Sequence, residues 1–399
     1  MSVPTDNRRR VLYLQSNSEI GGSDVCLLRM VEALDRSRFD PLVVLPSDGP
    51  LTGALRERGA SLFILREMMK LTTRKGKLYY LRYLYNYPKA VGKILRIIRG
   101  ERIDVVHSNT LHNLHGFLAA RLARRPHVWH VREIVLQSRF FRRLELALAR
   151  RYADRVVAMS GAIAEAFRDG GAPPPRQLRI IPDGIDTERF HPRNSGDRIR
   201  SELGIEAGAP VVGLVCRLDH WKGVEVFLRA AAVVRSRLPE ARYLVVGGPV
   251  EGQEKFAARM IGLAGALGLD GFVHFTGWRY GPGDMPEVHA ALDVLVLAST
   301  WPEPFGLVLL EAMATGRPVV ATRHGGPVEI CAEGETALLV PPRDADAMAD
   351  TIVALLRDPH RARSMGAAGR ARVLQLFDHR RYGRELQLLY EEVLMSPGT

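Results

Sequence analysis

The sequence predicts an α/β protein of two domains, each built around a parallel β-sheet with helices on both faces. Short, mostly apolar segments alternate with segments whose apolar residues recur at helical spacing. Strands of this kind suit a parallel sheet covered on both sides. A length of 399 residues suits two or three domains, and Gly and Pro interrupt the alternation once, between residues 170 and 192.

In the first half, the apolar strand at residues 11–14 is followed by Gly21 and Gly22 and then by apolar residues at helical spacing up to residue 34. Strand, glycine turn and helix predict a βα unit. The other elements expected in this half are strands at 42–45, 62–65, 103–107, 128–131 and 155–159, and helices at 51–58 and 114–122.

The second half repeats the alternation. Its expected elements are strands at 211–215, 243–248, 273–275, 294–297 and 318–321, and helices at 226–234, 307–313 and 382–394. We place the linker near residues 185–200, and we predict an N-terminal domain at 1–190, a second domain at 191–378 and a C-terminal helix within 379–399.

Composition narrows the class of protein. No apolar stretch of 18 residues is present, and the basic first ten residues lack an apolar signal core, so neither a membrane span nor secretion is indicated. We expect a cytoplasmic protein. The three cysteines are an odd count without zinc spacing, which predicts reduced thiols.

The net charge of +12 is concentrated in the first half. Residues 1–195 hold 34 Lys/Arg and 19 Asp/Glu, whereas residues 196–399 hold 22 and 25. The segment that begins at Lys70 and ends at Arg102 has ten basic residues, one acidic residue and interleaved tyrosines. Such a segment fits an anionic membrane surface, whose headgroup layer suits tyrosine. A solvated pair of basic helices explains the same charges.

Glu303 and Glu311 stand eight positions apart around the expected start of a helix. Pro304 suits the first helical position, and Phe305 and Gly306 leave backbone N–H groups free for an anion. If the run is helical, a rise of about 1.5 Å per residue separates the two carboxylates by about 12 Å, comparable to the span from a hexose to a ribose across a diphosphate. The run therefore indicates a sugar-nucleotide clamp, with Glu303 on sugar hydroxyls and Glu311 on the ribose diol.

Arg217 and Lys222 follow the first strand of the second domain, where they face the end of the sheet at which ligands bind. Fixed cations at such a position stabilise the charge that develops on a departing nucleoside diphosphate. A solvated basic turn is the alternative.

The segment Glu-Pro-Phe-Gly with a second Glu eight residues after the first resembles the Glu-x7-Glu signature of the retaining nucleotide-sugar glycosyltransferases of family 4, which have the GT-B fold of two Rossmann-like domains facing a cleft. The resemblance implies a retaining glycosyltransferase with a UDP-linked rather than a GDP- or ADP-linked donor. It implies that Arg217 and Lys222 hold the leaving phosphate, which takes the acceptor proton, and that neither a metal nor a cofactor is needed. As in relatives, the last helix is expected to cross back to the first domain.

The resemblance also assigns further residues. It places Gly21 and Gly22 against the donor diphosphate, and it assigns a role near the transferred sugar to His130, although relatives have His-Asp where this chain has His-Val-Arg-Glu. The roles of Arg132 and Glu133 stay open. The remaining donor-binding positions are Phe305, Gly306, Leu307, Gly277 and Trp278, of which the last two follow the strand whose backbone binds the nucleobase in relatives.

The expected acceptor is a saccharide or lipid-linked saccharide, as in cell-surface polysaccharide or glycolipid synthesis. A GT-B epimerase or phosphorylase would share the site, and a non-catalytic nucleotide-sugar sensor would bind the donor without turnover. A nucleic-acid binder is suggested by charge alone, but no aromatic and basic recognition motif supports it.

Overall fold

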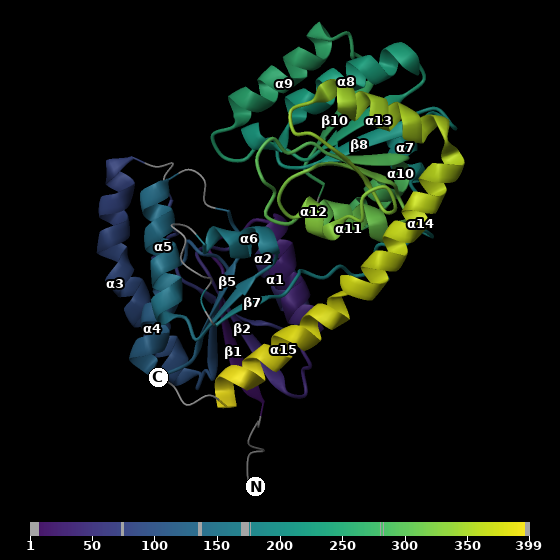
Figure 1. Ribbon diagram of the computed structural model, residues 1–399. Coiled ribbons are helices and arrows are strands. Elements are labelled where there is room, and N and C mark those ends of the chain that lie inside the picture. Colours follow the sequence, from purple (N-terminus) through teal and green to yellow (C-terminus); the bar gives the residue numbers. More distant parts are fainter. Residues whose placement is uncertain are drawn as a thin grey trace. The chain divides into compact units, whose positions relative to one another are not determined.

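The computed structural model describes residues 8–72, 76–134, 138–168, 175, 177–279, 281 and 283–395. The chain forms two units, coloured by sequence in Figure 1. One comprises residues 1–184 together with 379–399, and the other comprises residues 185–378. The chain therefore passes from the first unit to the second after Gly184, whereas the predicted boundary is at residue 190.

The described residues of the first unit form a parallel sheet of seven strands in the order β3-β2-β1-β4-β5-β6-β7. Its strands are β1 (Arg9–Leu14), β2 (Phe39–Leu45), β3 (Ser61–Ile64), β4 (Val105–Ser108), β5 (His127–Val131), β6 (Arg155–Ala158) and β7 (Leu178–Ile180). The order reverses between β1 and β4, which is the point where doubly wound sheets bind ligands. The sequence did not predict β7, because three residues are too few to show a strand pattern.

Helices cover both faces of this sheet. They are α1 (Gly22–Ala33), α2 (Pro50–Glu57), α3 (Lys77–Gly100), α4 (His115–Ala123), α5 (Arg139–Tyr152), α6 (Gly161–Ala166) and α15 (His379–Met395). Val11 and Tyr13 of β1 pack with residues of α1, α2 and α15, whereas Leu12 and Leu14 pack with residues of α3 and α4. This two-sided cover explains why the four residues from Val11 to Leu14 are all apolar.

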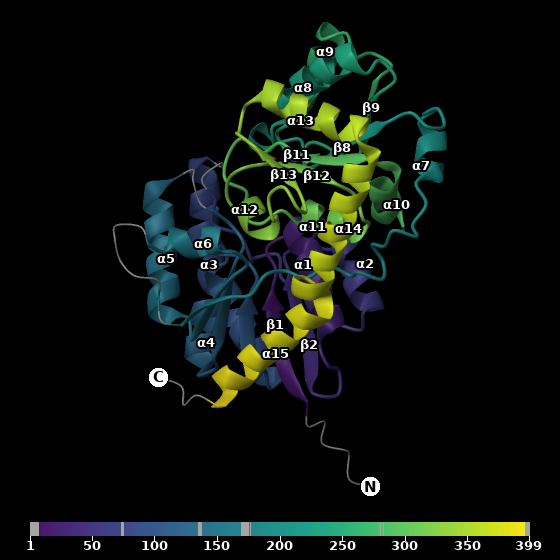
Figure 2. The same ribbon diagram turned by 45° about the vertical axis from the view of Figure 1, so that its right-hand side comes forward.

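The C-terminal helix α15 belongs to the first unit and lies across β1 and β2, as Figure 2 shows. Its buried residues, among them Leu386 and Tyr390, recur at helical spacing. The Tyr390 hydroxyl lies 3.0 Å from the Tyr13 hydroxyl and 2.8 Å from Nδ1 of His107. The helix therefore closes one face of the first sheet and satisfies polar groups beneath it.

The second unit contains a parallel sheet, six-stranded in its described residues, in the order β10-β9-β8-β11-β12-β13. Its elements are α7 (Asp197–Glu202), β8 (Val211–Val215), η2 (His220–Lys222), α8 (Val224–Arg237), β9 (Arg242–Val246), α9 (Glu254–Ala266), β10 (Val273–Gly277), α10 (Asp284–Ala291), β11 (Val294–Leu297), α11 (Leu307–Ala314), β12 (Val319–Thr322), α12 (Pro327–Ile330), β13 (Leu338–Val340), α13 (Ala345–Arg357) and α14 (Pro359–Leu376). The two sheets confirm the predicted class of two Rossmann-like domains. Within the described part of the chain, none of the helices combines the length and apolar character that spanning a bilayer requires.

We expect Leu386→Ala to lower the free energy of unfolding of the first unit by about 2–4 kcal/mol, because it leaves a cavity under α15. Leu386 is 1% exposed, whereas Leu388 in the same helix is 60% exposed, so Leu388→Ala is a matched control with an effect below about 0.5 kcal/mol. Hydrogen exchange of the β1 amides measures the change in the free energy of unfolding in both variants. Equal loss of protection in the two variants would contradict this packing of α15.

Candidate functional site

Lys222 and Glu303 form an ion pair at the carboxyl edge of the second sheet. Lys222 ends η2 after β8, and Glu303 lies between β11 and α11. The Lys222 Nζ atom lies 2.9 Å from Oε1 and 2.8 Å from Oε2 of Glu303. The strand order reverses between β8 and β11, so the pair stands where ligands bind in doubly wound sheets.

The pair is held in a nearly buried setting. Glu303 is only 7% exposed, and its Oε2 atom also accepts a hydrogen bond of 2.7 Å from the Ser299 hydroxyl. The ring of Trp221 lies 4.0 Å from the Lys222 Nζ atom. A buried carboxylate is costly unless it is paired and hydrogen-bonded, so these partners fix the position of Glu303.

Two glycines let the loops that carry the pair approach their neighbours. Gly223, with φ of 71°, lies where an added Cβ would stand 1.8 Å from the carbonyl oxygen of Ala298. Gly325, with the same φ of 71°, lies where a Cβ would stand 2.3 Å from the carbonyl oxygen of Glu303. A larger residue at either position would displace the loop of Lys222 or that of Glu303.

Glu311 is oriented by a buried histidine that the sequence analysis did not single out. Glu311 is 8% exposed in α11, and its Oε2 atom lies 3.1 Å from Nε2 of His289 in α10. The His289 ring is fully buried, with its centroid 5.9 Å from that of Phe190. An imidazole N–H facing an ionised carboxylate donates to it, so His289 fixes one oxygen of Glu311.

The start of α11 differs from the prediction. The helix begins at Leu307, and Gly306 precedes it with a φ of 111°, so the expectation that Pro304 occupies the first helical position was wrong. The separation of about 12 Å, which assumed a helical rise throughout, therefore does not apply to Glu303 and Glu311. Phe305 is buried against Phe377, with ring centroids 6.2 Å apart, and supports the loop from within.

The other predicted residues of this unit lie at the same edge of the sheet. The side chain of Arg217, in the loop after β8, is 45% exposed, and its Nη2 atom lies 3.9 Å from Oδ2 of Asp219. Gly277 ends β10 with a φ of 67°. Trp278 packs over Gly248 after β9, where an added Cβ would stand 2.6 Å from the indole Nε1. The structure thus gathers Arg217, Trp278 and Glu303 at one edge, where Gly248 after β9 makes room for the Trp278 ring.

In the first unit, Gly21 and Gly22 lie at the start of α1, directly after the loop that follows β1. The backbone N–H of Gly21 donates to Oδ2 of Asp24 over 2.9 Å, and a Cβ added to Gly22 would meet no atom within 4 Å. Burial raises the pKa of Asp24 to about 6. Asp24 therefore shapes the glycine turn, and Gly22 keeps its backbone accessible.

His130 is the second-last residue of β5. The side chain is fully buried in β5, and its Nδ1 atom lies 3.3 Å from Nε2 of His107. Burial, together with the charge of Arg132 and with His107, holds the pKa of His130 well below its usual range. The contact of His130 with a transferred sugar stays a prediction.

Arg132 and Glu133 follow β5 and have distinct partners. The Arg132 Nη1 atom lies 2.6 Å from Oδ2 of Asp183, and its Nε donates to Oδ1 of Asn109 over 2.7 Å. Glu133 accepts hydrogen bonds from the Thr110 hydroxyl and from a backbone N–H of the loop after β4. Arg132 is thus an interior structural cation, whereas Glu133 is held at the sheet edge.

The histidines between residues 107 and 115 do not converge on one point. His107 contacts His130, His112 lies 2.8 Å from Oε1 of Glu145, and His115 lies 3.1 Å from Oδ1 of Asn113. Among the described residues, no three His, Cys, Asp or Glu side chains are grouped to hold a metal ion.

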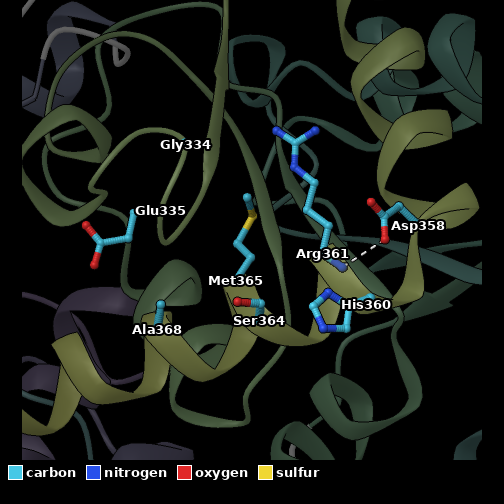
Figure 3. A pocket seen from close by; sticks show the side chains of 8 residues that line it. All are labelled: Gly334, Glu335, Asp358, His360, Arg361, Ser364, Met365 and Ala368. Carbon is cyan, nitrogen blue, oxygen red and sulfur yellow. Dashed lines mark hydrogen bonds between the residues drawn. The ribbon is translucent and has the colours of Figure 1, made fainter.

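A surface pocket of about 510 Å³ lies elsewhere in the second unit (Figure 3). It is formed by the loop that leads into β13 and by the start of α14, where the Asp358 carboxylate accepts the backbone N–H of Arg361 over 2.9 Å. Its lining residues are Gly334, Glu335, Asp358, His360, Arg361, Ser364, Met365 and Ala368. None of the predicted site residues lines this pocket.

Two family models match the chain. Residues 195–372 match the model described as Glycosyl transferases group 1, and residues 20–189 match the model described as Glycosyltransferase Family 4. The matched ranges correspond to most of the second and the first unit respectively.

Curated relatives match about half of the chain. The D-inositol 3-phosphate glycosyltransferase of Corynebacterium urealyticum is 37% identical over 210 residues, which are 52% of this chain and 49% of that protein. The GDP-mannose-dependent alpha-(1-6)-phosphatidylinositol monomannoside mannosyltransferase of Mycolicibacterium smegmatis is 35% identical over 221 residues, 53% of this chain and 56% of that protein. The chain spans about half the length of the curated relatives it matches.

Solved structures match over nearly the whole chain. Anabaena HepE in complex with UDP and glucose is 27% identical, with a TM-score of 0.83 over 96% of this chain and 100% of that chain. Sucrose-phosphate synthase from Thermosynechococcus elongatus is 25% identical, with a TM-score of 0.78 over 97% of this chain and 99% of that chain. These likenesses confirm the predicted GT-B fold.

We expect Lys222→Met to destabilise the second unit by about 3 kcal/mol, because it leaves Glu303 nearly buried without its cation. Adding Glu303→Gln should recover part of this loss. A double-mutant cycle, with each stability measured by urea denaturation, should give a coupling energy of about 1–3 kcal/mol. The exposed pair Arg323–Glu333, with side chains 48% and 45% exposed, is the control and should couple by less than about 1 kcal/mol. Equal coupling in the two cycles would argue against the importance of burial.

Proposed function

We propose that the protein transfers a sugar from a nucleotide-diphosphate donor to an acceptor, because its two halves match two glycosyltransferase family models and the chain has a GT-B fold. The observation that carries this proposal is the set of groups at the reversal of the second sheet, where Glu303 is paired with Lys222 and Glu311 with His289. Fixed carboxylates suit hydroxyl groups, and cations at the same edge suit phosphates.

We propose that the donor is a UDP-sugar. HepE, which is 27% identical, has been crystallised in complex with UDP-glucose, and this supports uridine over other bases. The Mycolicibacterium smegmatis relative is GDP-mannose-dependent by name, so GDP is the competing proposal. In the proposed complex, Glu311 binds the ribose diol, Glu303 binds sugar hydroxyls, and the loop at Gly277 and Trp278 receives the base.

We propose that transfer retains the anomeric configuration. The bond between the anomeric carbon and the leaving phosphate oxygen breaks, the acceptor oxygen bonds to that carbon on the same face, and the acceptor proton passes to the leaving phosphate. Arg217 and Lys222 stabilise the charge on that phosphate. Lys222 now contacts Glu303, so the bound diphosphate would share this cation with the carboxylate. This route assigns no nucleophile to the protein.

The proposed acceptor is a saccharide or a lipid-linked saccharide of a polysaccharide, glycolipid or other glycoconjugate. A peripheral position on the inner face of a membrane would bring the protein to such an acceptor. The charge excess between Lys70 and Arg102 supports this location.

A thermal-shift panel of UDP-glucose, other UDP-sugars, GDP-mannose and ADP-glucose tests the donor, because a ligand that binds only the folded state raises the apparent stability. We expect a shift with a UDP-sugar. NMR of the product formed from that donor then reports the anomeric configuration. A thermal shift with GDP-mannose alone would identify guanosine instead of uridine as the base of the donor. A product with inverted anomeric configuration would contradict the retaining mechanism. Release of a free epimerised sugar would indicate an epimerase.

We expect Glu311→Gln and His289→Asn to weaken binding of both UDP-sugar and free UDP, because the ribose is common to the two ligands. Glu303→Gln should weaken the UDP-sugar and spare free UDP. Calorimetry with both ligands measures the difference, and Glu333→Gln on the exposed surface is the control. Parallel losses for both ligands in all three site variants would rule out this division of roles.

A further inference from the structure

Helices α3 and α5 of the first unit turn large apolar side chains toward solvent. On α3, Leu78, Leu81 and Leu84 are 79%, 64% and 67% exposed. On α5, Phe140 is 71% exposed. We use the name α3/α5 surface for the exposed apolar side chains of these two helices, which are Leu78, Leu81, Leu84, Tyr85, Phe140 and Leu144.

The two helices are adjacent, so these side chains belong to one region of the surface. Tyr80 of α3 stacks on Phe141 of α5, with ring centroids 6.2 Å apart and planes at 8°. Figure 1 and Figure 2 both show α3 beside α5. Single exposed leucines are ordinary, whereas a group of this size marks an interaction surface.

The exposed leucines are additional to the face by which α3 packs. That face buries Tyr83, Ala90, Val91, Ile94 and Ile98. A helix that lies on a soluble domain normally has polar residues opposite its buried stripe. The first turns of α3 are instead apolar on both sides, so their outer face is suited to an apolar environment.

Four of the five α3 tyrosines do not belong to this surface, which corrects the expectation that all five face a headgroup layer. The hydroxyls of Tyr79 and Tyr80 donate to the carbonyl oxygens of Lys70 and Thr72 over 2.8 and 2.7 Å. Tyr83 is 6% exposed, and the hydroxyl of Tyr87 donates to the carbonyl oxygen of Leu114 over 2.8 Å. Of the five, only Tyr85 is largely exposed.

Two of the basic residues in that expectation, Arg74 and Lys75, lie outside the described residues.

The charge around the α3/α5 surface is strongly positive. The sequence of α3 contains six Lys or Arg and no acid, and that of α5 contains five Arg and one Glu, the buried Glu145. Exposed cations that flank the leucines are Lys77, Arg82 and Lys89, and the Lys89 Nζ atom lies 3.6 Å from the centroid of the Tyr85 ring. The same surface on a second copy would carry the same charge, which disfavours self-association through it.

We propose that the α3/α5 surface docks on an anionic phospholipid bilayer by inserting its apolar side chains among the headgroups. Apolar residues rimmed by Lys and Arg are the pattern of a helix that lies in a membrane interface. The cations contact lipid phosphates while the leucines leave water. Docking therefore needs both apolar insertion and charge, and it is independent of the donor chemistry of the second unit.

Co-sedimentation with phosphatidylglycerol-containing vesicles and with pure phosphatidylcholine vesicles tests the proposal. We expect binding to the anionic vesicles only, and we expect the triple variant Leu78→Gln, Leu81→Gln, Leu84→Gln to reduce it about tenfold or more without any change in charge. The matched control is Leu374→Gln, Leu388→Gln, which alters leucines that are 47% and 60% exposed on α14 and α15. The control should bind like the natural protein.

Unchanged binding of the triple variant would overturn insertion, and absence of the natural protein from anionic vesicles would overturn docking altogether. Light scattering completes the test. A natural protein that is a dimer and a triple variant that is a monomer would assign the surface to contact with a second copy instead. The thermal shift with UDP-sugar should be equal in all variants. Its loss in the triple variant would show misfolding, in which case Leu81→Gln alone repeats the comparison.

Discussion

The contact between Lys222 and Glu303 is the constraint on which the candidate site depends. It ties the loop after β8 to the loop after β11, the two strands between which the order of the second sheet reverses. A carboxylate that is 7% exposed needs this cation and the Ser299 hydroxyl, and the glycines at 223 and 325 allow the necessary approach of the loops. The sheet topology, the backbone conformation of the two loops and the ion pair therefore all fix the position of the Glu303 carboxylate, as a pre-organised site requires.

Much of the fold follows from patterns within single segments. The last four residues of β1 are all apolar because Val11 and Leu12 enter different core layers, and this pattern is visible in the sequence. Strands β7 and β13, with three residues each, are too short to show such a pattern. The start of α11 was misplaced because Pro304 suits a first helical turn, whereas Gly306, with a positive φ, delays the helix to Leu307.

Local reasoning can reach the partners of a candidate residue that lie near it in sequence, and it misses the partners that meet it only in space. Ser299 lies four positions before Glu303, so its contribution was within reach of local reasoning. His289 precedes Glu311 by 22 positions and belongs to another helix, and no local signal marks it. His130, which was expected near a transferred sugar, lies buried in β5 beside His107, a neighbour 23 positions away that local patterns do not mark. The charge between Lys70 and Arg102 was evident, but which side chains of α3 face outward depends on its packing against α4.

The first unit is assembled from both ends of the chain, and this has a consequence for synthesis on the ribosome. The core face that contains Val11 and Tyr13 is completed by Leu386 and Tyr390 of α15. All of residues 185–378 are made between the two parts, which takes about 10–40 s at a synthesis rate of about 5–20 residues per second. The second unit is therefore complete first, while the N-terminal sheet waits with one face uncovered for the last helix to emerge. A nascent chain in this interval is a natural client for chaperones, and a premature stop within α15 would harm the domain that was translated first.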